Sequence, residues 1–104
     1  MSLDVNIRLR KKLRCKECGQ VVCLAPVYDD VDEVDTGGRV LWEYLDSIGY
    51  GDSNYGEYVE LTEEQADALA KFSIMNEVYN RREVAYLIET AKTKDYVVEL
   101  EADW

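Results

Sequence analysis

The sequence predicts an α+β domain: a small, mainly antiparallel sheet with an N-terminal β-hairpin that carries a Cys-x2-Cys knuckle, packed by about three helices. Three observations predict it. Side chains alternate with period two near both ends of the chain, two capping boxes precede apolar stripes of helical spacing, and short turn-rich segments separate these elements. The expected order is β, β, α, β, α, α, β, in one domain that spans residues 1–104, since a chain of this length supports a single core.

The hairpin begins with a strand that has a basic face. Apolar residues occupy the odd positions 3, 5, 7, 9, 13 and 15, whereas the even positions include Arg8, Arg10, Lys12 and Arg14, which is the pattern of a half-buried strand. Residues 20–28 are expected to form the return strand. Pro26 indicates an edge or a bulge there, because proline cannot donate to a sheet.

A short amphipathic helix is expected over residues 36–48, with Gly49 as its C-terminal cap and Trp42 in the core. Its stripe consists of Leu41, Tyr44, Leu45 and Ile48. A brief strand over residues 57–61 follows a turn-rich loop.

Two capping boxes, Thr62 with Gln65 and Asn80 with Glu83, predict the starts of two further helices. The stripe of the first is Ala66, Leu69, Ala70, Ile74 and Val78, and that of the second is Val84, Leu87, Ile88 and Ala91. Alternation over residues 96–101 predicts the last strand.

The charge is unevenly distributed and favours binding over chemistry. The net charge is −10, yet six of the twelve basic residues lie within the first sixteen positions, and the other 88 residues carry 21 acids and 6 bases. The chain has no histidine, the usual proton-transfer side chain, so we expect a protein that is not an enzyme. The negative electrostatic field of the protein favours a basic protein partner and disfavours direct nucleic-acid binding.

The three cysteines suggest a structural zinc site. Cys15, Cys18 and Gly19 form a Cys-x2-Cys-Gly turn, which directs two sulfurs at one metal, and Cys23 is the expected third ligand. A fourth ligand would have to be a carboxylate such as Asp29, Asp30 or Asp52. In a regular return strand Cys23 lies more than about 10 Å beyond the turn, so it coordinates only if the strand bends back. Otherwise Cys23 is a small core residue, and Cys15 and Cys18 form a reduced pair.

Acidic and tyrosine-bearing segments are the expected contact surface. One segment, residues 29–35, places five carboxylates in seven residues, and a later loop adds an acid and tyrosines. The spacing of the five carboxylates is not that of a calcium-binding loop. The acidic segment is therefore either a solvated loop or a surface that mimics the spacing of phosphates. Tyrosine is enriched at interfaces, although core packing explains the loop tyrosines equally well. The expected partner-binding residues are Asp29, Asp30, Asp32, Glu33, Asp35, Asp52, Tyr50 and Tyr55.

The opening residues Met1 to Val5, followed by a strand and the Cys15–Cys18 turn, resemble the start of small uncharacterised proteins encoded by phages and prophages. In size, charge and lack of catalytic residues the chain also resembles anti-CRISPR proteins that act on type II effector nucleases. This resemblance implies a non-enzymatic inhibitor that binds a basic nucleic-acid-binding surface of a nuclease, or of another nucleic-acid enzyme, and blocks DNA engagement. It implies no particular site residues.

Two other functions remain open. A zinc-stabilised adaptor or transcription regulator would touch nucleic acid through the basic N-terminal strand, and a redox enzyme would use Cys15 and Cys18. No segment has the roughly 20 apolar residues that span a bilayer, and the start lacks the apolar core of a signal peptide. We therefore expect a monomer in the cytoplasm of a bacterial host cell, without membrane contact.

Overall fold

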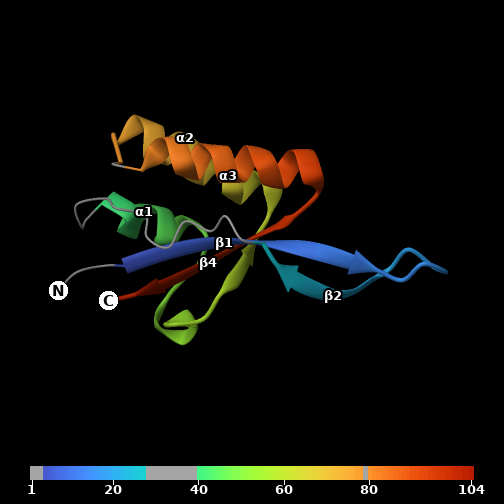
Figure 1. Ribbon diagram of the computed structural model, residues 1–104. Helices are drawn as coiled ribbons and strands as arrows, with labels where there is room; N and C mark the ends of the chain where they lie inside the picture. The colour runs from blue at the N-terminus through green and yellow to red at the C-terminus, as the bar shows by residue number, and fades with distance from the viewer. Residues whose placement is uncertain (1–3, 28–39, 79) are drawn as a thin grey trace.

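A sheet of four antiparallel strands, covered on one face by helices, forms a two-layer α+β fold (Figure 1). The computed structural model describes residues 4–27, 40–78 and 80–104. The elements in chain order are β1 (Asp4–Arg14), β2 (Val21–Pro26), α1 (Val40–Ser47), the 3-10 turn η1 (Asp52–Asn54), β3 (Val59–Leu61), α2 (Glu63–Met75), α3 (Arg81–Lys94) and β4 (Val97–Asp103). The predicted fold class and the predicted order of elements are confirmed.

The two ends of the chain form the centre of the sheet. The strand order is β2-β1-β4-β3, and β1 pairs with β4 from Asp4 opposite Asp103 to Arg10 opposite Val97. Because neighbouring side chains on a strand point to opposite faces, this register gives the sheet one apolar and one charged face. The apolar face carries Val5, Ile7, Leu9, Val98, Leu100 and Ala102, all buried.

The hairpin of β1 and β2 projects beyond the body of the domain (Figure 1). The pairing of β1 with β4 stops at Arg10, where its pairing with β2 begins and runs on to Arg14. A bulge between Leu13 and Arg14 shifts the register, so Val22 is the extra residue on β2. The molecule is accordingly elongated, 48 × 29 × 22 Å. We call residues 11–26 the arm.

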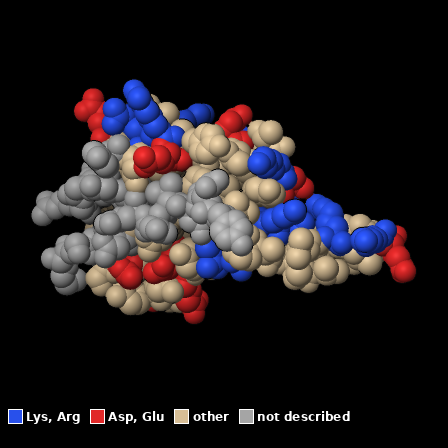
Figure 2. Space-filling model, viewed as in Figure 1, with Lys and Arg blue, Asp and Glu red and all other residues tan. Residues whose placement is uncertain are grey.

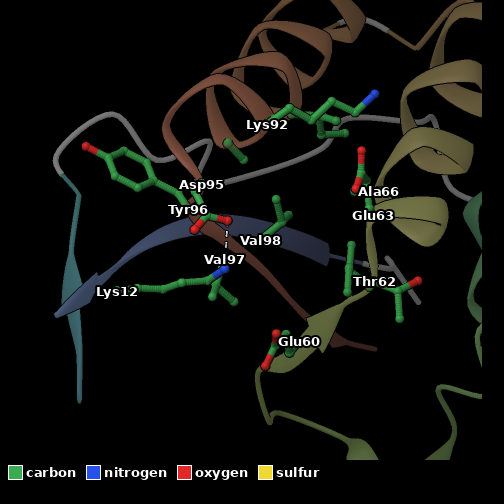
Figure 3. A pocket seen from close by; sticks show the side chains of 13 residues that line it. Lys12, Glu60, Thr62, Glu63, Ala66, Lys92, Asp95, Tyr96, Val97 and Val98 are labelled. Atoms are coloured by element: carbon green, nitrogen blue, oxygen red, sulfur yellow. Dashed lines mark hydrogen bonds and ion pairs between the residues drawn. The ribbon is translucent and has the colours of Figure 1, made fainter. Parts of the chain in front are cut away.

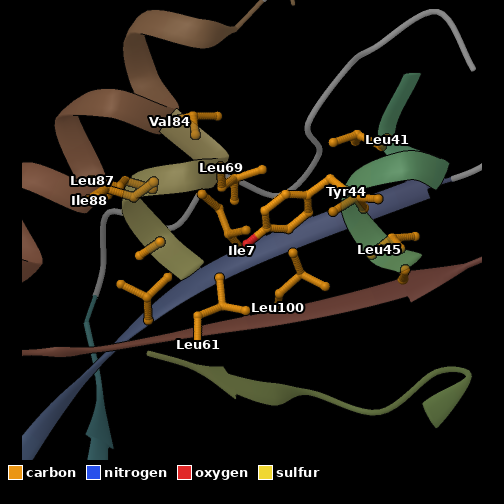
Figure 4. Packing of buried hydrophobic residues seen from close by; sticks show 14 of the residues in the cluster. Ile7, Leu41, Tyr44, Leu45, Leu61, Leu69, Val84, Leu87, Ile88 and Leu100 are labelled. Carbon is orange, nitrogen blue, oxygen red and sulfur yellow. The ribbon is translucent and has the colours of Figure 1, made fainter. Parts of the chain in front are cut away.

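The core lies between the apolar sheet face and the three helices (Figure 4). Ile7, Leu61 and Leu100 contribute from the sheet. The helical residues are Leu41, Tyr44 and Leu45 of α1, Ala66 and Leu69 of α2, and Val84, Leu87, Ile88 and Ala91 of α3. The predicted stripes of α1 and α3 are thus confirmed.

The helix ends follow the predicted signals in two places and depart from them in one. Gly49 has φ +76° after α1, where the Tyr50 amide donates to the Leu45 carbonyl at 2.9 Å, as expected for a glycine cap. The Thr62–Gln65 box forms in both directions, at 3.1 and 2.9 Å. The Asn80–Glu83 box predicted the start of α3 correctly, since Asn80 is the N-cap residue, but the capping contact was wrong: Asn80 lies at φ −101°, ψ 30°, and its side chain makes no capping hydrogen bond. A capping side chain reaches the first turn from an extended backbone, which Asn80 lacks.

Two residues expected in the core are exposed. Ile74 is 57% exposed because α2 turns Ser73 inward instead, and Val78 is buried only after the helix has ended. Trp42 is 39% exposed because it lies one position off the stripe of α1.

Candidate functional site

An aromatic cluster joins α1, the loop after α1 and the end of β4. The Trp104 ring packs edge-on against Trp42 and Tyr55, with centroid distances of 5.1 and 4.8 Å. The Tyr55 hydroxyl also donates to the Trp104 carbonyl at 3.1 Å. Trp42 and Tyr55 remain 39% and 49% exposed. We call Trp42, Tyr55 and Trp104 the aromatic face.

In the sequence, acidic residues lie close to each residue of the aromatic face. Its three elements contain Glu43 and Asp46 in α1, Asp52 and Glu57 around Tyr55, and Glu101 and Asp103 in β4. Residues 40–70 hold eight acids and no lysine or arginine. Glu43, Asp46, Asp52 and Asp103 form no ion pair with another described residue. The negative potential at this end is therefore not neutralised within the described parts of the chain.

The predicted contact residues divide into three groups. Tyr55 is part of the aromatic face, and Asp52 lies in the same exposed loop. Tyr50 is 5% exposed and belongs to the core, so it presents no contact surface; its hydroxyl is bonded to the backbone of residues 54, 57 and 102. Asp29, Asp30, Asp32, Glu33 and Asp35 lie outside the described residues.

Sequence reasoning missed Trp42 and Trp104. The signal for Trp42 was present, since the helical stripe of α1 excludes its position. No local signal marked Trp104, because its partners are 49 and 62 residues away in the sequence.

The basic row of β1 is matched by carboxylates of the neighbouring chain segment. Arg8 and Arg10 approach Glu99 at 2.8 and 3.5 Å, and Lys12 and Arg14 approach Asp95 at 2.9 and 3.2 Å. Figure 2 shows lysine and arginine side chains gathered along the projecting hairpin. The hydrogen bond from Lys12, with that from Arg14, lowers the pKa of Asp95 below its ordinary value. The basic residues of β1 thus neutralise the charges of Glu99 and Asp95 within the same chain.

The cysteine turn has the backbone arrangement of a metal knuckle. The Cys15 amide donates to the Gln20 carbonyl and the Gly19 amide donates to the Cys15 carbonyl, both at 2.8 Å, and Gly19 has φ +73°. Cys15 and Cys18 lie 3.6 Å apart. Hydrogen bonds from the amide of Cys18, then from that of Glu17, lower the pKa of the Cys15 thiol, because they stabilise its thiolate.

Cys23 does not join this pair. It lies opposite Leu13 on β2, two residues before Cys15 along β1, and its side chain is exposed rather than packed in the core. Among the described residues no three histidine, cysteine or acidic side chains gather closely enough to hold a metal. The turn therefore supplies two of the four donors that zinc requires.

A cleft of about 230 Å³ lies between α2, α3, the end of β3 and the start of β4 (Figure 3). Its charged lining consists of Lys12, Glu60, Glu63, Lys92 and Asp95. Lys12 is bound to Asp95 across the cleft, and Lys92 pairs with Asp67. The hydrogen bond with Asp67 raises the pKa of Lys92, so this amine stays protonated and is unsuited to act as a base.

None of the helices in the described part of the chain has the length and hydrophobicity to cross a membrane. No protein-family model, no curated protein and no solved structure matches this chain.

Proposed function

We propose that this protein is a non-enzymatic inhibitor whose acidic, aromatic end binds a basic nucleic-acid-binding surface of another protein and keeps nucleic acid out. The observation that carries the proposal is the exposed aromatic face, set among acids that have no cationic partner in the described residues. The proposed partner is a type II CRISPR effector nuclease or another nucleic-acid enzyme, as the anti-CRISPR resemblance implies.

Exposed aromatic rings are the side chains best suited to anchor such a contact. Tryptophan and tyrosine dominate the energetics of protein interfaces, since each offers a large rigid surface with one polar atom. Here Trp104 holds the other two rings in place, so little side-chain entropy would be lost on binding.

The surrounding acids supply the complementary charge. A cleft that binds nucleic acid is lined with lysine and arginine, and an acidic surface competes for it with the phosphates. Unneutralised acids also raise the association rate with a basic partner by a factor of roughly 10 to 1,000, in a salt-dependent manner.

The ion pairs of β1 favour this function over the nucleic-acid-binding alternative. Arg8, Arg10, Lys12 and Arg14 would have to leave Glu99 and Asp95 before they could neutralise phosphates. A cationic side chain that must first leave a carboxylate contributes less to the affinity for nucleic acid than an unpaired cationic side chain does.

The test uses a purified type II effector nuclease loaded with guide RNA and measures cleavage of target DNA. Wild-type protein is expected to inhibit cleavage when added before DNA, with potency that falls as salt rises. The Trp42→Ala, Tyr55→Ala double variant is expected to lose at least about tenfold in potency.

Tyr86→Ala is the matched control, because Tyr86 is an exposed aromatic, at 65%, on the outer face of α3. It should inhibit as well as wild type does. Equal loss in both variants would refute the assignment to the aromatic face. If a panel of such nucleases shows neither inhibition nor binding at low salt, the inhibitor function itself is refuted.

A further inference from the structure

The tip of the arm is clear of the rest of the domain. Beyond Arg10, β1 pairs with β2 alone among the strands that the structure describes, and the Cys15–Gln20 turn lies at the far end of the longest dimension of the molecule (Figure 1). Arg14 braces this turn through a hydrogen bond from its guanidinium to the Gly19 carbonyl at 2.9 Å. The turn is thus both accessible and held in one conformation.

The turn is preorganised for two metal–sulfur bonds. Two sulfurs bound at about 2.3 Å to one tetrahedral zinc are about 3.8 Å apart. Cys15 and Cys18 already lie 3.6 Å apart, and the amides of Glu17 and Cys18 point at the Cys15 sulfur. Little rearrangement is needed for both thiolates to bind the same ion.

Two thiolates leave two positions of a tetrahedral zinc unfilled. Cys23 is the nearest further cysteine in the sequence, but it lies along the strand, opposite Leu13, and outside the pair. From the geometry of the tip we propose that Cys15 and Cys18 of two copies of this chain hold one zinc ion, which joins the copies arm to arm.

Exposed apolar side chains near the tip fit a second copy. Val21 and Val22 are 44% and 66% exposed, and they lie within a few residues of the knuckle. Leu13, at 38%, lies on the opposite face of the hairpin from Val21, since Val21 pairs with Arg14. Burial of such side chains between two tips would stabilise the dimer by about 25 cal/mol per Å² of apolar area. A single copy leaves these side chains in water.

The test measures mass and zinc content of the full chain under reducing conditions. With a chelator present, analytical ultracentrifugation should give a monomer. With stoichiometric Zn²⁺ it should give a dimer that holds one zinc per two chains. Co²⁺ in place of zinc should show the thiolate-to-metal charge-transfer absorption of a tetrahedral four-sulfur site.

Two variants make the inference falsifiable. Cys18→Ser removes one donor per copy and should abolish both the dimer and the tight metal binding. Cys23→Ser is the matched control, since it replaces an equally exposed cysteine of the arm, and should retain both. Circular dichroism of each variant checks that the core, which excludes the arm, stays folded.

Several results would overturn the inference. One zinc per monomer that is lost in Cys23→Ser would place the site within one chain. A dimer that persists with the chelator would exclude zinc as its cause, and failure of reduced protein to take up Zn²⁺ or Co²⁺ would exclude the site. None of these results bears on the inhibitor function, because the aromatic face involves no residue of the arm.

Discussion

Arg8 and Glu99, 91 residues apart in the sequence, are directly opposed across the two central strands, and Arg8 Nε donates to Glu99 Oε1 at 2.8 Å. The Arg8 guanidinium carbon also lies 3.5 Å from the centre of the Tyr58 ring. Only 14% of the Glu99 side chain is exposed, so water screens this pair less than a surface pair. The charged face of the sheet is therefore organised around Glu99.

Glu99→Gln is expected to lower the free energy of unfolding by about 1–2 kcal/mol, since it leaves two half-buried guanidinium groups with a weaker acceptor. Urea denaturation of this variant, Arg8→Met and the double variant gives the coupling energy of the pair. Glu60→Gln is the control. Glu60 lies opposite Glu99 on β3, where like charges repel, so its neutralisation should leave stability unchanged or raise it. A coupling energy near zero would contradict the central role of Glu99.

The pKa of Asp95 should depend on Lys12. The folded pKa lies below the ordinary value of 3.8 because Lys12 and Arg14 donate to the carboxylate. The contact therefore stabilises the fold above the unfolded pKa, and this stabilisation is lost as pH falls through the lowered folded pKa. In Lys12→Met, NMR titration should show the Asp95 pKa moved up toward its ordinary value. Lys11→Met, on the exposed side of the arm, should leave it in place; equal shifts in both would mean a general field effect.

Tyr50→Phe should destabilise the fold more than Tyr44→Phe. The Tyr50 hydroxyl accepts from the buried Ala102 amide at 2.9 Å, and its loss leaves that donor without a partner, at a cost of about 1–3 kcal/mol. The Tyr44 hydroxyl only donates, at 2.7 Å, to the Gln65 carbonyl, which also accepts within α2, so its loss should cost about 1 kcal/mol or less. Thermal and urea unfolding of both variants measure the difference. The reverse order would contradict this account of Tyr50.

Ser73→Ala should stabilise the protein. Ser73 is fully buried on α2, and its hydroxyl has no hydrogen-bond partner among the described residues. Removal of a buried, unsatisfied hydroxyl is expected to raise the free energy of unfolding by about 1 kcal/mol. Thr90→Ala, which removes a hydroxyl that bonds to its own helix, should change it little. A loss of stability in Ser73→Ala would mean that the hydroxyl is satisfied.

Local sequence patterns determined the order of the elements, most of the core and the cysteine turn. The alternation of β1, the stripe of α3 and the Thr62–Gln65 box each involve residues a few positions apart, so neighbouring residues suffice to specify them. The pattern failed at Ile74, where Ser73 faces the core instead, and at Asn80, whose backbone does not support a side-chain cap.

Only the tertiary structure decided which charges and aromatic rings are available to a partner. Basic side chains of β1 neutralise Glu99 and Asp95. Tyr50 is buried while Tyr55 is exposed, and the Trp42 ring packs against the ring of Trp104, which is far from it in the sequence. These relationships join residues about 50 to 90 positions apart, whose proximity depends on strand register and layer packing. A sequence lists such residues, but the pairing of the first strand with the last is what brings them together.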